Sequence, residues 1–123
     1  EPQLEVTASN IAGEWQLTEW KGEPLAEGSY VYIAFDRRER TYTLYQNLDS
    51  FSTRTLTGSF FIETDPELGA VIRGNYDYDR GDWAHRYWVI SLTANEMVWV
   101  NLDNVVDQSV YTRTTIPAEI KGE

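Results

Sequence analysis

Apolar and polar residues alternate in short runs along most of the chain, and turn residues separate the runs. A period of two places successive side chains on opposite faces, which is typical of a half-buried β-strand. We predict strands over residues 13–20, 29–36, 41–47, 53–64, 70–76, 84–93, 96–102 and 107–114. The connections are too short for parallel crossovers, so neighbours in sequence are expected to pair antiparallel.

Eight antiparallel strands in sequence order can close into a barrel or form an open two-layer sandwich, and strand spacing by itself fits both. A closed barrel removes the exposed sheet edges and leaves an interior wide enough for side chains or one small ligand. We therefore predict an all-β fold, an eight-stranded antiparallel up-and-down β-barrel, with the sandwich as the alternative.

Three positions in this pattern predict local features. Trp15 and Leu17 share one face of the first strand, whereas Trp20 falls on the other face unless a bulge intervenes. Gly58, inside the fourth predicted strand, indicates a bend or bulge of the kind that turns a barrel corner. Gly69 ends an Asp-Pro-Glu-Leu-Gly turn, where a positive φ is expected.

The two ends of the chain show no strand pattern. Residues 1–11 are predicted to be a tail or a short helical turn that plugs one end of the barrel, with Thr7, Ser9 or Asn10 as its cap. The barrel domain is assigned to residues 12–115. Residues 116–123 are expected to form a frayed C-terminal tail.

Two short motifs near the ends carry a family resemblance. Gly13–Trp15 (GEW) opens the first predicted strand, and Tyr111–Arg113 (YTR) closes the last one. They resemble the G-x-W motif and the terminal-strand arginine of the lipocalins and the wider calycin group. The resemblance implies that Gly13, Trp15 and Arg113 form the base of the barrel. In that base the guanidinium lies on the tryptophan ring, where a cation–π attraction stabilises the contact.

Residues 11–17 and 30–45 are more particularly similar to the small lipocalin-like domains of secreted bacterial proteins, many of them lipoproteins without an assigned function. The resemblance covers roughly residues 11–115. It implies an exported protein, located in the periplasm, at the cell surface or outside the cell, and leaves room for a lipid anchor in a precursor. The chain is shorter than a typical animal lipocalin. Its barrel can therefore either enclose a cavity or be filled by its own aromatic residues.

Aromatic residues are abundant, with five Trp, eight Tyr and four Phe. Large rings fit the pleated surface of a strand, and an interior lined with them offers apolar area while tyrosine hydroxyls orient a ligand. The candidate ligand-binding residues, all in predicted strands, are Tyr32, Tyr42, Tyr45, Trp88, Trp99 and Tyr111. The alternative for each of them is a place in a packed aromatic core.

Composition excludes several classes of function. The net charge of −10 argues against nucleic acid as a partner, because binding a phosphate backbone needs a surplus of Lys and Arg. The chain has no cysteine, which removes disulfides and cysteine-based metal or redox chemistry. No run is long and apolar enough to cross a bilayer as a helix. No pattern indicates the oligomeric state.

No motif predicts catalysis, a bound metal or a cofactor. His85 is the only histidine, and no serine lies in the context of an activated nucleophile. Asp77, Asp79 and Asp82 have the alternating spacing of a calcium loop. Arg80 interrupts them and no bidentate Glu follows, so a solvated acidic turn is expected.

The sequence therefore predicts a non-enzymatic, exported protein that binds a small apolar or amphipathic molecule inside its barrel. The alternative is an interaction module with a packed barrel, which acts through its surface on a protein or a carbohydrate. In the carbohydrate version, Trp83 or Tyr78 would be exposed and would stack on sugar rings. An enzyme built around His85 is the third hypothesis.

Overall fold

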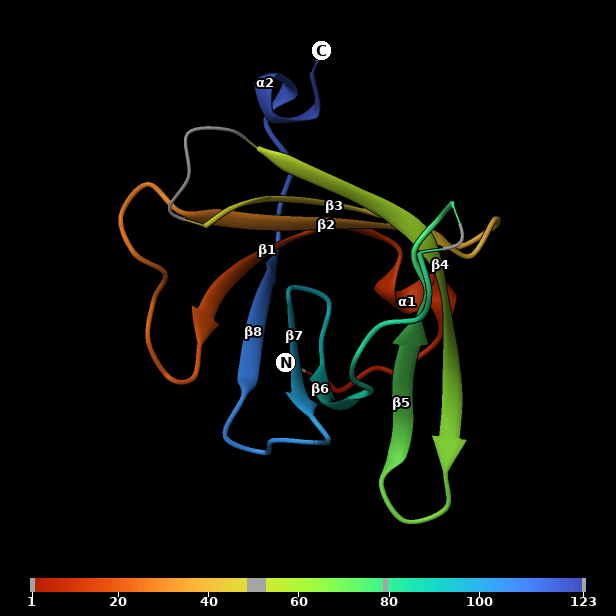
Figure 1. The fold of residues 1–123 in the computed structure, drawn as a ribbon. Coiled ribbons are helices and arrows are strands. Elements are labelled where there is room, and N and C mark those ends of the chain that lie inside the picture. Colours follow the sequence, from red (N-terminus) through yellow and green to blue (C-terminus); the bar gives the residue numbers. More distant parts are fainter. Residues whose placement is uncertain (1, 49–52, 79, 123) are drawn as a thin grey trace.

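Eight strands form one closed antiparallel barrel, as the sequence predicts (Figure 1). The computed structural model describes residues 2–48, 53–78 and 80–122. The strands are β1 (Gly13–Trp20), β2 (Tyr30–Asp36), β3 (Thr41–Asn47), β4 (Arg54–Asp65), β5 (Gly69–Gly74), β6 (Tyr87–Leu92), β7 (Glu96–Asn101) and β8 (Gln108–Arg113). Each strand pairs with its neighbour in sequence, and β1 pairs with β8. This closure excludes the open sandwich.

The observed strands differ from the predicted ones mainly at β6. Residues 84–86, predicted to begin this strand, lie in the loop before Tyr87. Only two residue pairs, Val71 with Trp88 and Ile72 with Tyr87, then join β5 to β6. The prediction was too long here because the chain before Tyr87 forms a loop that carries Trp83 into the barrel.

A β-bulge decides which face of β1 carries Trp20. The register with β8 shifts between Leu17 and Glu19, after which Trp20 pairs with Ser109. The extra residue reverses the alternation, so Trp20 faces the interior together with Trp15 and Leu17. The bulge that the sequence pattern allowed is therefore present.

The long strand β4 turns a corner of the barrel. Its first half pairs with β3 and its second half with β5, and the partner changes between Ser59 and Phe60. Gly58 lies just before this change, and a Cβ atom there would collide with the carbonyl oxygen of Asn75. Glycine is required at the predicted bend because two backbone segments approach each other so closely.

The β4–β5 turn has the predicted conformation. Gly69 has a φ of 94°. The Asp65 carboxylate accepts hydrogen bonds from the N–H groups of Glu67 and Leu68, at 2.8 and 3.0 Å. An aspartate at the start of such a turn satisfies backbone donors that the sheet leaves unpaired.

The N-terminal segment forms the predicted helical plug. Thr7 caps α1 (Ala8–Ile11), and its hydroxyl accepts a hydrogen bond from the N–H of Asn10 at 3.1 Å. Ala8 and Ile11 are buried and belong to the hydrophobic core. The plug thus lies at the end of the barrel where β1 begins.

The C-terminal segment is ordered against the barrel, which corrects the expectation of a frayed tail. It forms α2 (Ala118–Lys121), which lies outside the barrel wall (Figure 1). Glu14 on β1 holds this segment: its carboxylate accepts the N–H of Ile116 at 2.8 Å and pairs with the Lys121 ammonium at 2.5 Å. Ile116 itself is only 3% exposed. Long-range contacts, which a local pattern does not reveal, fix the tail.

Candidate functional site

The two ends of the barrel interior differ in packing. At the end plugged by α1, called the closed end here, Trp15, Phe60, Leu92 and Met97 are almost fully buried. The rings of Phe35 and Phe60 meet edge to face, with centroids 5.0 Å apart. The other end, called the open end, carries the loops 21–29, 75–86 and 102–107. The side chains at the closed end thus form a packed core, beside which Ala8, Arg40, Phe60, Phe61 and Ile62 line a smaller hollow of about 240 Å³.

Gly13, Trp15 and Arg113, the residues of the predicted base, come together at the closed end. The Arg113 guanidinium lies 4.0 Å from the centroid of the Trp15 ring. It also donates to the carbonyl oxygens of Ala12 at 2.6 Å, Ala94 at 2.9 Å and Asn10 at 3.0 Å. These bonds tie the plug and the β6–β7 turn to the last strand.

Gly13 completes the base for a conformational and a steric reason. Its φ is 113°, a value that other residues rarely adopt. A Cβ atom on Gly13 would lie 2.7 Å from Nη1 of Arg113. The Trp15 indole in turn donates to the carbonyl oxygen of Ile11 at 2.8 Å, so the ring has a fixed orientation.

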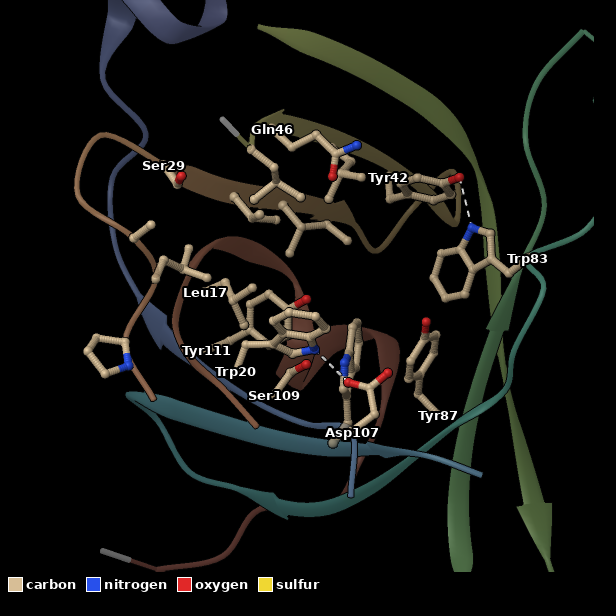
Figure 2. Close-up of a pocket in the computed structure, with 18 of the residues that line it drawn as sticks. Leu17, Trp20, Ser29, Tyr42, Gln46, Trp83, Tyr87, Asp107, Ser109 and Tyr111 are labelled. Carbon is tan, nitrogen blue, oxygen red and sulfur yellow. Dashed lines mark hydrogen bonds between the residues drawn. The ribbon is translucent and has the colours of Figure 1, made fainter. Parts of the chain in front are cut away.

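Between this base and the open end lies a cavity of about 580 Å³. A volume of this size is typical of sites for small molecules, which span about 300–1,000 Å³. Figure 2 shows much of the lining, with side chains that converge from several strands on a common space. The lining residues are Leu17, Trp20, Glu23, Pro24, Leu25, Ala26, Ser29, Val31, Ile33, Tyr42, Leu44, Gln46, Leu48, Tyr76, Trp83, Tyr87, Trp99, Asp107, Ser109 and Tyr111.

A continuous row of five aromatic rings forms one wall of the cavity. Tyr87 on β6 is at its centre, and Trp99 on β7 is stacked on Tyr87 with centroids 5.0 Å apart and edge to face with Tyr111 at 4.9 Å. Trp83 extends the row, 6.1 Å from Tyr87 and 5.2 Å from Tyr42. Offset and edge-to-face contacts of this kind stabilise aromatic clusters. The wall is therefore rigid while one side of it remains open to the cavity.

The polar atoms on this wall are only partly satisfied. Tyr42 donates its hydroxyl hydrogen to the carbonyl oxygen of Asn75 and accepts the Trp83 indole N–H, at 2.8 and 2.9 Å (Figure 2). In the described parts of the chain, no residue forms a hydrogen bond with the hydroxyl of Tyr87 or Tyr111. Both hydroxyls are therefore available to a molecule in the cavity.

Both hydroxyls are protonated at neutral pH, and burial raises their pKa values further. Burial raises the pKa of Tyr87 to about 12, and the nearby Asp107 carboxylate adds to the rise. The pKa of Tyr111 is also raised, again mainly by burial, with smaller contributions from Tyr87 and Asp107. At neutral pH each phenol can donate one hydrogen bond and accept others.

The mouth of the cavity carries a carboxylate that is held in place by neutral donors. Asp107 accepts the Trp20 indole N–H at 2.6 Å and the Asn101 amide N–H at 3.2 Å. Glu23, in the loop that follows Trp20, also lines the mouth. Within residues 2–48, 53–78 and 80–122, no Lys, Arg or His forms an ion pair with Asp107.

Three of the six predicted ligand-binding residues, Tyr42, Trp99 and Tyr111, line the cavity. The other three, Tyr32, Tyr45 and Trp88, do not. Strand alternation explains the difference, because the inward neighbours are Val31 and Ile33 beside Tyr32, Leu44 beside Tyr45, and Tyr87 beside Trp88. These three rings lie on the outer face, where the Trp88 indole donates to the carbonyl oxygen of Leu68 at 2.9 Å.

Sequence reasoning missed Trp20, Trp83 and Tyr87 as lining residues. The bulge in β1 is a signal for Trp20, since it reverses the face of every residue after it. Trp83 is in a loop without periodicity, and Tyr87 is adjacent to an equally large ring at Trp88. Of the two residues suggested for stacking on a sugar, Trp83 is not exposed, and a Cβ atom on Gly74 would collide with its ring, whereas Tyr78 is exposed.

The remaining described candidates for chemistry are not among the residues that line the cavity. His85 Nδ1 is 2.8 Å from Oδ2 of Asp103, and neither residue lines the cavity. In the predicted acidic turn, Asp77 accepts a hydrogen bond from the Thr57 hydroxyl at 2.7 Å, while Asp79 is outside the described residues. Across the described ranges, His, Asp and Glu side chains form no group of three that can hold a metal ion.

Fold and cavity together define the class of protein: a small closed antiparallel barrel with a plugged base and an internal cavity toward the other end. The family model for a lipocalin-like domain matches residues 11–99, which is more than half of the chain. The chain therefore belongs to the family of lipocalin-like domains. A search of curated proteins found no match. No helix in the described part of the chain is long and apolar enough to cross a membrane.

Proposed function

We propose that the protein is a non-enzymatic binding protein that holds a small apolar or amphipathic molecule in its barrel. The observation that carries the proposal is the cavity of about 580 Å³, which lies above a packed base and is lined mostly by aromatic and aliphatic side chains. A ligand that enters it exchanges water for apolar contacts, and this burial supplies most of the affinity.

The few polar groups of the cavity support a role in orienting the ligand. The hydroxyls of Tyr87 and Tyr111 have no partner among the described residues, and Ser109 lies beside them on β8. Both hydroxyls are accessible from the cavity, so a ligand that replaces the water at these oxygens with its own hydrogen bonds gains over one that does not. This arrangement favours an amphipathic ligand over a pure hydrocarbon.

The packed-barrel alternative has less support. Its carbohydrate version required Trp83 or Tyr78 as an exposed platform. Tyr78 is exposed, but Trp83 contributes its ring to the cavity wall. A single exposed tyrosine is ordinary on a protein surface.

Absence of catalysis and export from the cytoplasm are also part of the proposal. The first is supported by the general character of the lipocalin family as binding proteins and by the absence of His85 from the residues that line the cavity. The second rests on the resemblance to secreted bacterial domains alone. Fractionation of cells that express the full-length gene product tests it.

Native mass spectrometry of protein purified from an exporting bacterial host, followed by solvent extraction, tests ligand binding directly. We expect a bound mass that is lost on denaturation. Binding is measured in parallel with Nile red, a neutral apolar dye, by its fluorescence. If no bound mass is found and the dye does not bind, the proposed function is wrong.

A matched pair of variants on β3 locates the site. Leu44 lines the cavity, whereas Tyr45 lies on the outer face of the same strand. Leu44→Trp is expected to fill the cavity and abolish dye binding, while Tyr45→Trp leaves dye binding unchanged. Equal loss in both variants, or in neither, would place the binding site elsewhere.

A further inference from the structure

We propose that the cavity selects organic cations, that is, molecules with an apolar body and one ammonium group; this deepens the proposed ligand-binding function and rests on it. The ammonium group is placed among the aromatic wall, the hydroxyls of Tyr87 and Tyr111, and the carboxylate of Asp107. Four properties of the cavity lead to this choice.

The first property is the sign of the charges that line the cavity. Among the described lining residues, the ionisable groups that are charged at neutral pH are Glu23 and Asp107, both negative, and none is Lys or Arg. An anionic amphiphile such as a fatty acid would bring its carboxylate to a half-buried site whose lining holds two carboxylates, and the nearby Lys21 ammonium lies over the Trp20 ring rather than in the lining. Taking a charge out of water without a partner is costly, so this class of ligand is disfavoured.

The second property is the unpaired charge of Asp107. Its two oxygens accept hydrogen bonds from Trp20 and Asn101, which are neutral donors. These bonds fix the carboxylate at the edge of the cavity without neutralising it (Figure 2). A ligand cation would supply the missing opposite charge at a site where water screens it less than on the surface.

The third property is the arrangement of rings. Tyr42, Trp83, Tyr87, Trp99 and Tyr111 form one wall, and Trp20 lies at the mouth. The faces of aromatic rings carry negative potential and attract ammonium groups, tryptophan most strongly. The chain already uses this attraction at Trp20, where the Lys21 ammonium lies 4.6 Å from the ring centroid.

The fourth property is the state of the two buried phenols. The hydroxyl of Tyr87 points into the open space of the cavity (Figure 2). Asp107 contributes to the raised pKa of both Tyr87 and Tyr111, so its negative field reaches their oxygens. A field that opposes the formation of a phenolate favours a cation at the same place. Each hydroxyl oxygen can also accept an N–H hydrogen bond from a protonated amine.

The test compares three probes that share one alkyl chain: decyltrimethylammonium, decanol and decanoate, each below its micelle concentration. Their affinities are measured by calorimetry and by displacement of Nile red at neutral pH. We expect the cation to bind about tenfold more tightly than the alcohol, and the carboxylate to bind weakest.

Because the whole protein is acidic, a matched charge change separates the cavity from the general surface potential. Asp107→Asn keeps an oxygen that can accept the Trp20 indole N–H and removes the charge. Glu39→Gln removes one charge from the exposed β2–β3 turn at the closed end. We expect Asp107→Asn to lower the preference for the cation over the alcohol to about two- or threefold, whereas Glu39→Gln leaves it unchanged.

The outcomes distinguish this inference from the function on which it rests. If the three probes compete for the dye with equal affinity, or if decanoate binds best, the cavity binds ligands but does not select cations. If the preference for the cation survives in Asp107→Asn, the selection comes from elsewhere and the proposed site is wrong. If no probe binds to the folded protein, the proposed function and the cation selection both fail.

Discussion

The closed and open ends of the barrel both contain a tryptophan of β1. The two ends differ in how deeply that ring is buried and in which groups bind its indole N–H. At the closed end Trp15 is completely buried, its indole N–H has a backbone acceptor, and a guanidinium covers its ring. At the open end Trp20 is 46% exposed, and its indole N–H contacts a carboxylate at the rim. Both tryptophans belong to β1, and only their surroundings distinguish them.

This difference assigns stability to one end and recognition to the other. Filled volume and hydrogen bonds within the protein stabilise the fold, while open volume and hydroxyls that face it provide contacts that a ligand can make. Substitutions at the closed end should therefore change mainly the free energy of unfolding. Substitutions at the open end should change mainly binding.

The largest expected effect on stability distinguishes the two tryptophans of β1. Trp15→Ala leaves a cavity in the packed base and removes the ring on which the Arg113 guanidinium lies. We therefore expect a loss of about 3–5 kcal/mol in the free energy of unfolding. Trp20→Ala removes a half-exposed ring and should cost only about 1 kcal/mol. Urea unfolding measures both. Similar losses in the two variants would contradict the division between the ends.

Two glycines packed behind the aromatic wall, against Tyr42 and Trp83, test whether backbone or side chains set the shape of the cavity. A Cβ atom on Gly58 would meet the backbone carbonyl of Asn75, which cannot move without breaking the pairing around it. A Cβ atom on Gly74 would meet the ring of Trp83, on a loop at the open end. We expect Gly58→Ala to cost about 2–3 kcal/mol and Gly74→Ala about 1 kcal/mol.

Gly74→Ala should also change dye binding in the cavity, because Trp83 must leave its position on the wall. Urea unfolding gives the two stabilities, and the emission of Nile red gives the binding. Unchanged dye affinity in a folded Gly74→Ala variant would show that Trp83 is not part of the binding wall.

The closed base can be weakened without changing its charge. Arg113→Lys keeps the positive charge near Trp15 but cannot reach the three carbonyl oxygens that the guanidinium now satisfies. We expect a loss of about 1–2 kcal/mol from carbonyl groups left without a donor. Dye affinity should remain that of the wild type. A combined loss of stability and binding would mean that the base also shapes the cavity.

The barrel was predictable from the sequence because strand alternation and short turns repeat along the whole chain. The base was predictable because the family motifs match the sequence at Gly13, Trp15 and Arg113. The side of each strand that faces inward was harder to predict. Tyr42 and Tyr45 are three positions apart in one regular strand, so period two requires that they face opposite sides. Both were nevertheless candidates for the cavity.

The remaining errors arise where local alternation carries no information. β2 is apolar at nearly every position, so its sequence does not distinguish Val31 from Tyr32 as the inward residue. The ring of Trp83 reaches the cavity from a loop, where no periodic pattern predicts which side chains point inward. The C-terminal segment is held by Glu14, which lies 102 positions before Ile116 in the sequence and accepts a hydrogen bond from its N–H. Such contacts depend on the closed barrel that precedes them.

The smallest expected effect concerns that C-terminal segment. Burial by itself raises the pKa of Glu14, but the hydrogen bonds from Lys121 and the Ile116 N–H and the charge of Lys121 outweigh it and lower the pKa below 4.5. A carboxyl group with a lowered pKa stabilises the fold above its unfolded pKa, and this contribution disappears as the pH falls through the folded value. Glu14→Gln should therefore cost less than about 1 kcal/mol at pH 7.

The difference between wild type and Glu14→Gln should shrink as the pH falls through the lowered pKa of folded Glu14 and vanish well below it, where both proteins carry a neutral side chain at this position. Glu119→Gln is the matched control, because Glu119 is exposed on α2 and forms no ion pair among the described residues. Thermal unfolding across the acid range measures all three proteins. Parallel curves for wild type and Glu14→Gln would mean that the Glu14 charge does not hold the tail. Ile116, buried against the barrel, would then be left as the main anchor, and an Ile116→Ala variant measured at the same pH values would show whether apolar burial replaces the ion pair.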